Sequence, residues 1–177
     1  MPGMADPKFL ERLNAQLGSE FAAHHQYLSI AAYYDGLTMP QMAGFFYRQA
    51  AEERDHAMMM IRYLIDSDAD VEIPGVTAPA FRFPDITAPV ALALEQERRV
   101  QAEVHELLSI ARRADDFASD QFMQWFVKEQ VEEIATMNDL LTVVRRRPDS
   151  IEAIEDYVAR ETVRAGVDPT APRVAGA

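Results

Sequence analysis

The placing of proline constrains the fold of this chain more than any other feature of its sequence. The 177 residues include 10 prolines, and four of these fall in one short stretch: Pro74, Pro79, Pro84 and Pro89. The remaining prolines lie near segment ends, so long stretches are free of helix breakers. These stretches predict four long helices of similar length, at about 6–36, 40–66, 89–114 and 119–147. The sequence is therefore that of an all-α protein.

Capping signals mark several of the expected helix ends. Asp6 followed by Pro7 predicts a helix start, and Gly36 can serve as a C-cap. A capping-box pattern after the fourth segment predicts a shorter fifth helix at about 150–165. The remaining residues, 166–177, are expected to form a loose tail.

The connections between the long helices determine how they pack. Short links after the first and third helices force antiparallel neighbours. The link at 67–88, about 22 residues, can reach roughly 70 Å and return the chain to the other end, which makes the second and third helices parallel. A disordered linker between two helical hairpins is the alternative, but apolar residues favour a packed crossover: Val71, Ile73, Val76, Phe81, Phe83 and Ile86. We expect one domain, 1–177, with its four-helix bundle at about 7–147.

Each long helix carries a glutamate on the face that is predicted to point into the bundle. These four residues lie near the middle of their helices and should form one layer: Glu20, Glu53, Glu97 and Glu133. Buried carboxylates repel one another and lose hydration, at several kcal/mol each unless compensated. No lysine or arginine shares these faces, which leaves protonation or a metal ion. His56, one turn from Glu53, adds a nitrogen ligand, and this donor set suits iron or manganese.

Other conspicuous residues have simpler explanations. A neutral histidine bonded to a backbone carbonyl accounts for His24, and His25 and His105 are ordinary surface or packing residues. Core filling is the default for Tyr27 and Trp125, although near a metal either could donate hydrogen bonds or electrons. The run from Met58 to Met60 covers too many helix faces to be a soft-metal site.

Composition excludes several classes of function. A net charge of -12 disfavours nucleic acid and anionic membranes as partners. Without cysteine there is no disulfide, thiol nucleophile or iron–sulfur cluster. We find no apolar run long enough to span a membrane and no signal peptide at the start of the sequence, so the expected compartment is the cytoplasm.

Taken with their neighbours, the layer residues resemble the ferroxidase centre of the ferritin family. The strings Ala-Glu-Glu-Arg-Asp-His-Ala at 51–57 and Gln-Trp-Phe-Val-Lys-Glu-Gln at 124–130 look most like bacterial non-haem ferritins, some of which are called bacterioferritins. The resemblance covers nearly the whole chain. It implies a ferritin-like four-helix bundle with one long crossover and a short fifth helix.

The resemblance also implies roles for individual residues. One iron would be held by Glu20, Glu53 and His56, and Glu53 would bridge to a second iron held by Glu97 and Glu133. Beside the pair would lie Gln130 and Tyr27. A third, transit iron site would be formed by Glu52, Glu129 and Glu132. Asp120 aligns with the three-fold channel of the family, and the fifth helix would line the four-fold axis.

Two departures from the pattern of the haem-binding bacterioferritins bear on which cofactors to expect. Haem-binding bacterioferritins have a second Glu-x-x-His on the fourth helix and a haem-ligating methionine after the glutamate of the second helix. Here those places hold Gln130, Glu133 and Arg54, so no haem is expected. Fewer strong ligands at the second iron favour a metal that is oxidised and passed on.

By this resemblance the protein would store and detoxify iron in a shell of 24 subunits. It would oxidise Fe(II) with dioxygen or peroxide, and a reductase partner could serve in iron release. Two alternatives remain open: a di-iron peroxidase or oxygenase that keeps its metals, and a structural or cargo bundle with protonated glutamates.

Overall fold

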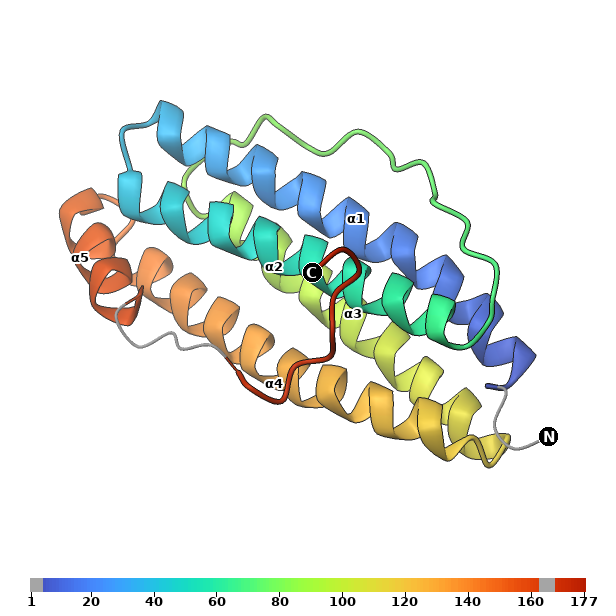
Figure 1. Ribbon diagram of the computed structural model, residues 1–177. Coiled ribbons are helices and arrows are strands. Elements are labelled where there is room, and N and C mark those ends of the chain that lie inside the picture. The colour runs from blue at the N-terminus through green and yellow to red at the C-terminus, as the bar shows by residue number, and fades with distance from the viewer. Residues whose placement is uncertain (1–4, 163–167) are drawn as a thin grey trace.

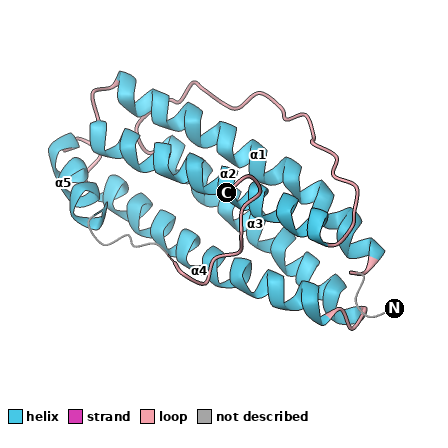
Figure 2. Ribbon diagram, in the orientation of Figure 1, coloured by secondary structure: helices cyan, strands magenta, loops and turns pink. Residues whose placement is uncertain are grey.

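Five helices make up the protein in a computed structural model that describes residues 5–162 and 168–177; no strand occurs among these residues (Figure 2). They are α1 (Pro7–Gly36), α2 (Pro40–Asp66), α3 (Ala88–Arg113), α4 (Phe117–Arg146) and α5 (Ile151–Thr162). The first four form the bundle, and α5 packs against one end of it (Figure 1). The all-α prediction is confirmed, and the bounds of the four long helices agree within two residues. The predicted end of the fifth helix at 165 lies outside the described residues.

Aspartate caps fix two helix starts and join them. Asp6 accepts hydrogen bonds from the backbone N–H groups of Lys8 and Phe9 at the start of α1. Asp116 accepts from the N–H of Ser119 at the start of α4 and from the N–H of Asp6, the latter at 2.8 Å. Each cap satisfies donors that a helix start leaves unpaired. The second also ties the first turn of α1 to that of α4.

The link between α1 and α2 differs in detail from its prediction. Gly36 ends α1, but the left-handed backbone conformation falls on Thr38, with φ of 58°. The N–H groups of Leu37, Thr38 and Met39 bond the last carbonyls of α1, and so close its end without a left-handed glycine. This tight turn brings α2 back antiparallel to α1.

The crossover between α2 and α3 runs along α1, as Figure 1 shows. The side chain of Gln26 brackets Ala80, donating to its carbonyl at 2.9 Å and accepting from its N–H at 3.0 Å. Ser29 donates to the same carbonyl, and Asn14 accepts from the N–H of Glu72. The packed crossover is confirmed, and polar contacts to α1 hold it in addition to apolar ones.

Apolar residues of the crossover divide into two sets. Val71, Phe83 and Ile86 are partly buried against the core, whereas Ile73 is 62% and Phe81 66% exposed. The apolar residues therefore favour a packed crossover, as predicted, but Ile73 and Phe81 do not themselves pack against the core. No helix in the described part of the chain is long and apolar enough to cross a membrane.

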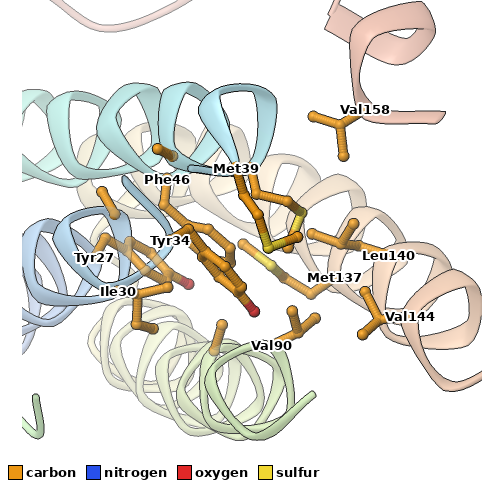
Figure 3. Packing of buried hydrophobic residues seen from close by; sticks show 14 of the residues in the cluster. Tyr27, Ile30, Tyr34, Met39, Phe46, Val90, Met137, Leu140, Val144 and Val158 are labelled. Carbon is orange, nitrogen blue, oxygen red and sulfur yellow. The ribbon is translucent and has the colours of Figure 1, made fainter. Parts of the chain in front are cut away.

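Two apolar clusters fill the interior of the bundle, one toward each end. The cluster toward α5 is rich in aromatic and sulfur side chains, among them Tyr27, Tyr34, Met39, Phe46 and Met137 (Figure 3). The other cluster contains Phe9, Leu13, Leu17, Met123 and Phe126. A polar layer lies between the two.

Residues 168–177, for which the sequence predicts a loose tail, instead cross α4 and α2 (Figure 1). The N–H of Ala175 donates to the carbonyl of Met58, and Val174 packs against the second apolar cluster. Asp168 accepts from the indole N–H of Trp125 and from Lys128, each at 3.1 Å. The tail therefore covers part of the α2 and α4 side of the bundle.

Candidate metal centre

Four glutamates and one histidine form the middle of the polar layer. The exposed fraction is at most 5% for each of Glu20, Glu53, His56, Glu97 and Glu133. Each comes from the inward stripe of its helix, at the positions where the three-and-four spacing of apolar residues is interrupted. The predicted burial of all four glutamates is thereby confirmed.

The first group of ligand atoms comes from α1 and α2. One potential ligand atom from each of Glu20, Glu53 and His56 lies within 4.8 Å of the others. The Nδ1 atom of His56 is 3.3 Å from Glu53 Oε2 and 3.7 Å from Glu20 Oε2. Burial alone would lower the pKa of His56, but the carboxylates of Glu20 and Glu53 beside its ring and the charge of Glu133 outweigh it, so that this pKa is raised well above its ordinary value.

The second group joins α2 to the other half of the bundle. Glu53, Glu97 and Glu133 offer carboxylate oxygens that also lie within 4.8 Å of one another. Burial and then neighbouring carboxylates raise the pKa of Glu53 and of Glu133 well above the ordinary glutamate value. Because Glu53 belongs to both groups, it occupies the position of a ligand that can bridge two ions.

Two neutral donors hold Glu97 in place. The hydroxyl of Tyr27 donates a short hydrogen bond to Glu97 Oε1, and the amide of Gln130 donates to Glu97 Oε2 at 2.6 Å. Tyr27 is fully buried, so burial and then the charge of Glu97 raise its pKa well above the ordinary value. Tyr27 is therefore a hydrogen-bond donor beside the centre as well as a core residue.

Several buried oxygens of the layer have no hydrogen-bond partner: Glu20 Oε2, Glu53 Oε2, Glu133 Oε1 and Glu133 Oε2. Buried polar atoms normally find partners, because an unpaired one costs about 1–3 kcal/mol and a charged one more. Hard oxygens with one imidazole match the preferences of iron and manganese. The residues present therefore fit a pair of such ions, with Glu53 between them.

A third group involves Glu129. Ligand atoms of His56, Glu129 and Glu133 lie within 4.8 Å of one another. Displacement of water by neighbouring protein atoms raises the pKa of Glu129 and of Glu52. Gln49 donates a short hydrogen bond to Glu52, and Glu132 is exposed. Within the described part of the chain, no group of this kind includes Glu52 or Glu132.

The structure also clarifies residues that the sequence left open. His24 Nδ1 lies 2.6 Å from the carbonyl oxygen of Ala50, which confirms the predicted carbonyl bond. Trp125 is partly buried, with its ring centroid 5.6 Å from that of His56 in an edge-to-face contact. It therefore forms part of the wall of the centre as well as packing against the core.

Sequence reasoning missed Gln16. This side chain is fully buried and donates to Glu20 Oε1 at 2.9 Å. The available signal was its position four residues before Glu20, between the inward-facing Leu13 and Leu17. A polar residue on that stripe indicates a hydrogen-bond partner for the carboxylate one turn away.

Comparison with known proteins gives concordant results. The profile of the ferritin family, described as Ferritin-like domain, matches residues 10–147. Ferritin BfrB of Mycolicibacterium smegmatis is 49% identical over 174 residues, covering 98% of this chain and 96% of that protein. The bacterial non-heme ferritin of Staphylococcus aureus is 36% identical over 154 residues, covering 87% of this chain and 93% of that protein.

Solved structures agree with the sequence matches. A crystal structure described as a novel open pore ferritin, from the archaeon Archaeoglobus fulgidus, superposes with a TM-score of 0.85 at 29% identity. The match covers 90% of this chain and 99% of that one.

Proposed function

This chain belongs to the ferritin family, and on that basis we propose that it stores iron, oxidising Fe(II) at the buried layer of glutamates and depositing Fe(III) inside a protein shell. The observation that carries the proposal is the sharing of Glu53 between two groups of ligand atoms, each within 4.8 Å. Two Fe(II) ions held on either side of one carboxylate can each lose one electron, and so supply two electrons together. Iron is the substrate in this scheme and is not a resident cofactor.

Each layer residue has a role in this proposal. Glu20, Glu53 and His56 bind one Fe(II), while Glu53, Glu97 and Glu133 bind the other. Gln130 and Tyr27 position Glu97 through their hydrogen bonds. Carboxylates suit a transient metal, because they are hard ligands that can bind through one or both oxygens.

Binding of Fe(II) displaces protons from the layer. The raised pKa values of Glu53, Glu133 and His56 mean that the metal-free centre holds protons to a higher pH than the same groups do in solution. A ligating carboxylate or imidazole must release its proton, so uptake is coupled to proton loss and becomes tighter as pH rises. Two Fe(II) then supply the two electrons that reduce dioxygen to hydrogen peroxide or peroxide to water.

Oxidised iron leaves toward the α2 and α4 side in this proposal. Glu129 shares a group of ligand atoms with His56 and Glu133, and so offers the next carboxylate along that path. Glu52 and Glu132 complete the proposed transit site. The matching relatives carry the ferritin name, and by analogy we propose a shell of 24 copies in the cytoplasm, with a separate reductase for iron release.

The test is anaerobic loading of the metal-free protein with Fe(II), well beyond two per chain, followed by air. We expect oxidation to continue past two irons per chain, and the iron to remain soluble within a large particle. The variant Glu53→Gln should abolish rapid oxidation of Fe(II). Glu95→Gln, an equal change of charge at an exposed position on α3, should leave this oxidation unchanged. Oxidation that stops near two irons per chain would instead identify the peroxidase or oxygenase alternative.

A further inference from the structure

A line of polar side chains connects the candidate metal centre with the surface between α1 and α3. Its central member is Gln16, whose side-chain nitrogen donates to Glu20 Oε1 and to Glu103 Oε2, each at 2.9 Å. Gln16 is completely buried, and Glu103, on α3, is partly exposed. One amide group therefore separates a ligand of the centre from a carboxylate that reaches solvent.

Arg12 holds this amide from the outside. Its guanidinium donates to Gln16 Oε1 at 3.0 Å and to Glu106 Oε2 at 2.9 Å. The bond to Gln16 orients its amide, with the oxygen toward Arg12 and the nitrogen toward the two carboxylates, and the bond to Glu106 holds the guanidinium in place. Arg12 is partly exposed, so its positive charge lies at the outer end of this line.

The surroundings of this line are apolar. Aliphatic side chains next to it in sequence on both helices are buried in the second apolar cluster: Leu13 and Leu17 on α1, and Val100, Val104 and Leu107 on α3. A divalent cation cannot cross such a wall without oxygen ligands, because its desolvation would cost far more than thermal energy. The carboxylates of Glu103 and Glu20 are close enough to share one amide nitrogen, so they can pass a cation from one to the other.

The inner end of the line is prepared to receive a cation. The second oxygen of Glu20, Oε2, is buried and has no hydrogen-bond partner. Its first oxygen, Oε1, accepts a hydrogen bond from Gln16 and from no other group in the part of the chain that the structure describes. Rotation of the Gln16 amide would thus free one oxygen of Glu20 toward Glu103 while the other faces His56.

We propose that Gln16 and Arg12 form a gate between α1 and α3, through which Fe(II) passes from Glu103 to Glu20. The proposal rests on the proposed function and adds a path of access to it. The gate opens when Arg12 releases Gln16 and keeps its contact with Glu106. This path approaches the centre from the side of the bundle opposite to residues 168–177.

The test compares initial rates of Fe(II) oxidation in stopped flow, with two Fe(II) per chain in air-saturated buffer. Glu103→Gln removes the receiving carboxylate, so we expect the initial rate to fall by roughly tenfold, the low end of electrostatic effects on cation association. Arg12→Met keeps the apolar stem of Arg12 but removes its charge and its bond to Gln16, and should raise the rate. Both side chains are at least partly exposed, so neither substitution threatens the core.

Matched controls separate the gate from general attraction of cations by surface charge. Glu95→Gln and Arg98→Met make the same changes of charge at exposed positions on α3, away from Gln16. We expect both controls to oxidise iron at the wild-type rate. Equal effects in the controls and the gate variants would overturn the proposal.

The remaining outcomes are equally decisive. Unchanged rates in Glu103→Gln and Arg12→Met, or changes in the same direction, would show that Fe(II) reaches the centre elsewhere and that Gln16 only satisfies Glu20. In either case the wild type would still oxidise iron. A wild type that oxidises no iron would instead contradict the proposed function, so the two failures are distinguishable.

Discussion

Glu133 shows most directly how the buried layer lowers the stability of the protein in the absence of a metal. It is 5% exposed, and neither of its carboxylate oxygens has a hydrogen-bond partner. We predict that Glu133→Gln stabilises the metal-free protein by about 1 kcal/mol near neutral pH, because the buried carboxyl group must either carry a charge among like charges or keep a proton that the unfolded chain has lost. Urea unfolding followed by circular dichroism measures this change.

The control for this prediction is Glu132→Gln. Glu132 is the exposed neighbour on the same helix, and its substitution should leave the free energy of unfolding nearly unchanged. With Zn²⁺ as a redox-inert probe, Glu133→Gln should lose most of the stabilisation that the metal gives to the wild type. A Glu133→Gln protein that is less stable than wild type without metal would contradict this account.

Tyr27 provides a second test at the level of single residues. Tyr27→Phe removes a buried donor to Glu97, so we predict a loss of about 1–2 kcal/mol in stability together with slower iron oxidation. Tyr34→Phe is the matched control, because the buried Tyr34 donates to the carbonyl of Ile86 outside the layer. It should cost comparable stability and leave oxidation unchanged. Equal oxidation rates in the two variants would show that Tyr27 has no role in iron oxidation at the centre.

Among the helices, the start of α1 and the start of α4 are coupled through their caps. Asp6→Ala loses two capping bonds and should destabilise the protein by about 1 kcal/mol. Asp116→Ala loses its own cap and the bond from the N–H of Asp6, so the expected loss is larger, about 2 kcal/mol. Guanidinium unfolding measures both changes. Asp139→Ala, at an exposed position inside α4, should cost little, and an equal loss in all three would argue against capping.

Helix bounds were largely predictable because proline and capping residues lie at fixed points of the sequence. Pro7 and Pro40 stand at the first positions of α1 and α2. The start of α4 was placed two residues late because the cap is Asp116, and Phe117 is helical although it is 78% exposed. The docking of residues 168–177 was not predictable, since it depends on Trp125, Lys128 and Met58, which lie on two other helices.

For the whole molecule, the layer makes stability depend on pH in a defined direction. Glu53 and Glu133 have raised pKa values, as does His56, so in the folded state they keep protons that the unfolded chain has lost. The contribution of these three groups to the free energy of unfolding of the metal-free protein therefore falls as pH rises above the ordinary glutamate value. Asp116 contributes to the pH dependence in the opposite direction. Burial would raise its pKa, but hydrogen bonds from Ser119 and from backbone N–H groups outweigh burial and lower it. Asp116 therefore loses its stabilising effect in acid.

We predict that the metal-free protein is most stable at about pH 5 and less stable at about pH 8. With saturating Zn²⁺ this trend should reverse, because the metal competes with the same protons. Thermal unfolding across this pH range, with and without Zn²⁺, measures both trends. Glu133→Gln should flatten the metal-free profile, and a profile that rises steadily from pH 5 to pH 8 without metal would refute the prediction.

The candidate centre could be located from sequence only in part. The inward direction of Glu20, Glu53, Glu97 and Glu133 follows from helical periodicity, and their common level follows from their positions near the middle of the helices. The sequence contains both. Gln16 and Glu103 meet only because α1 packs beside α3, and this contact between distant residues has no local signal. The edge-to-face contact of Trp125 with His56 likewise depends on how α4 faces α2.

The crossover at 67–87 also divides the molecule into two helical hairpins that meet at the metal centre. Glu20, Glu53 and His56 all belong to the first hairpin, whereas Glu97 and Glu133 belong to the second. A chain cut in the exposed part of the crossover, near Gly75, would give two fragments, of which neither holds the complete pair of ligand groups. Metal binding would then report the reassembly of the fragments, which makes this fold a candidate for a split protein whose two halves are joined by an ion.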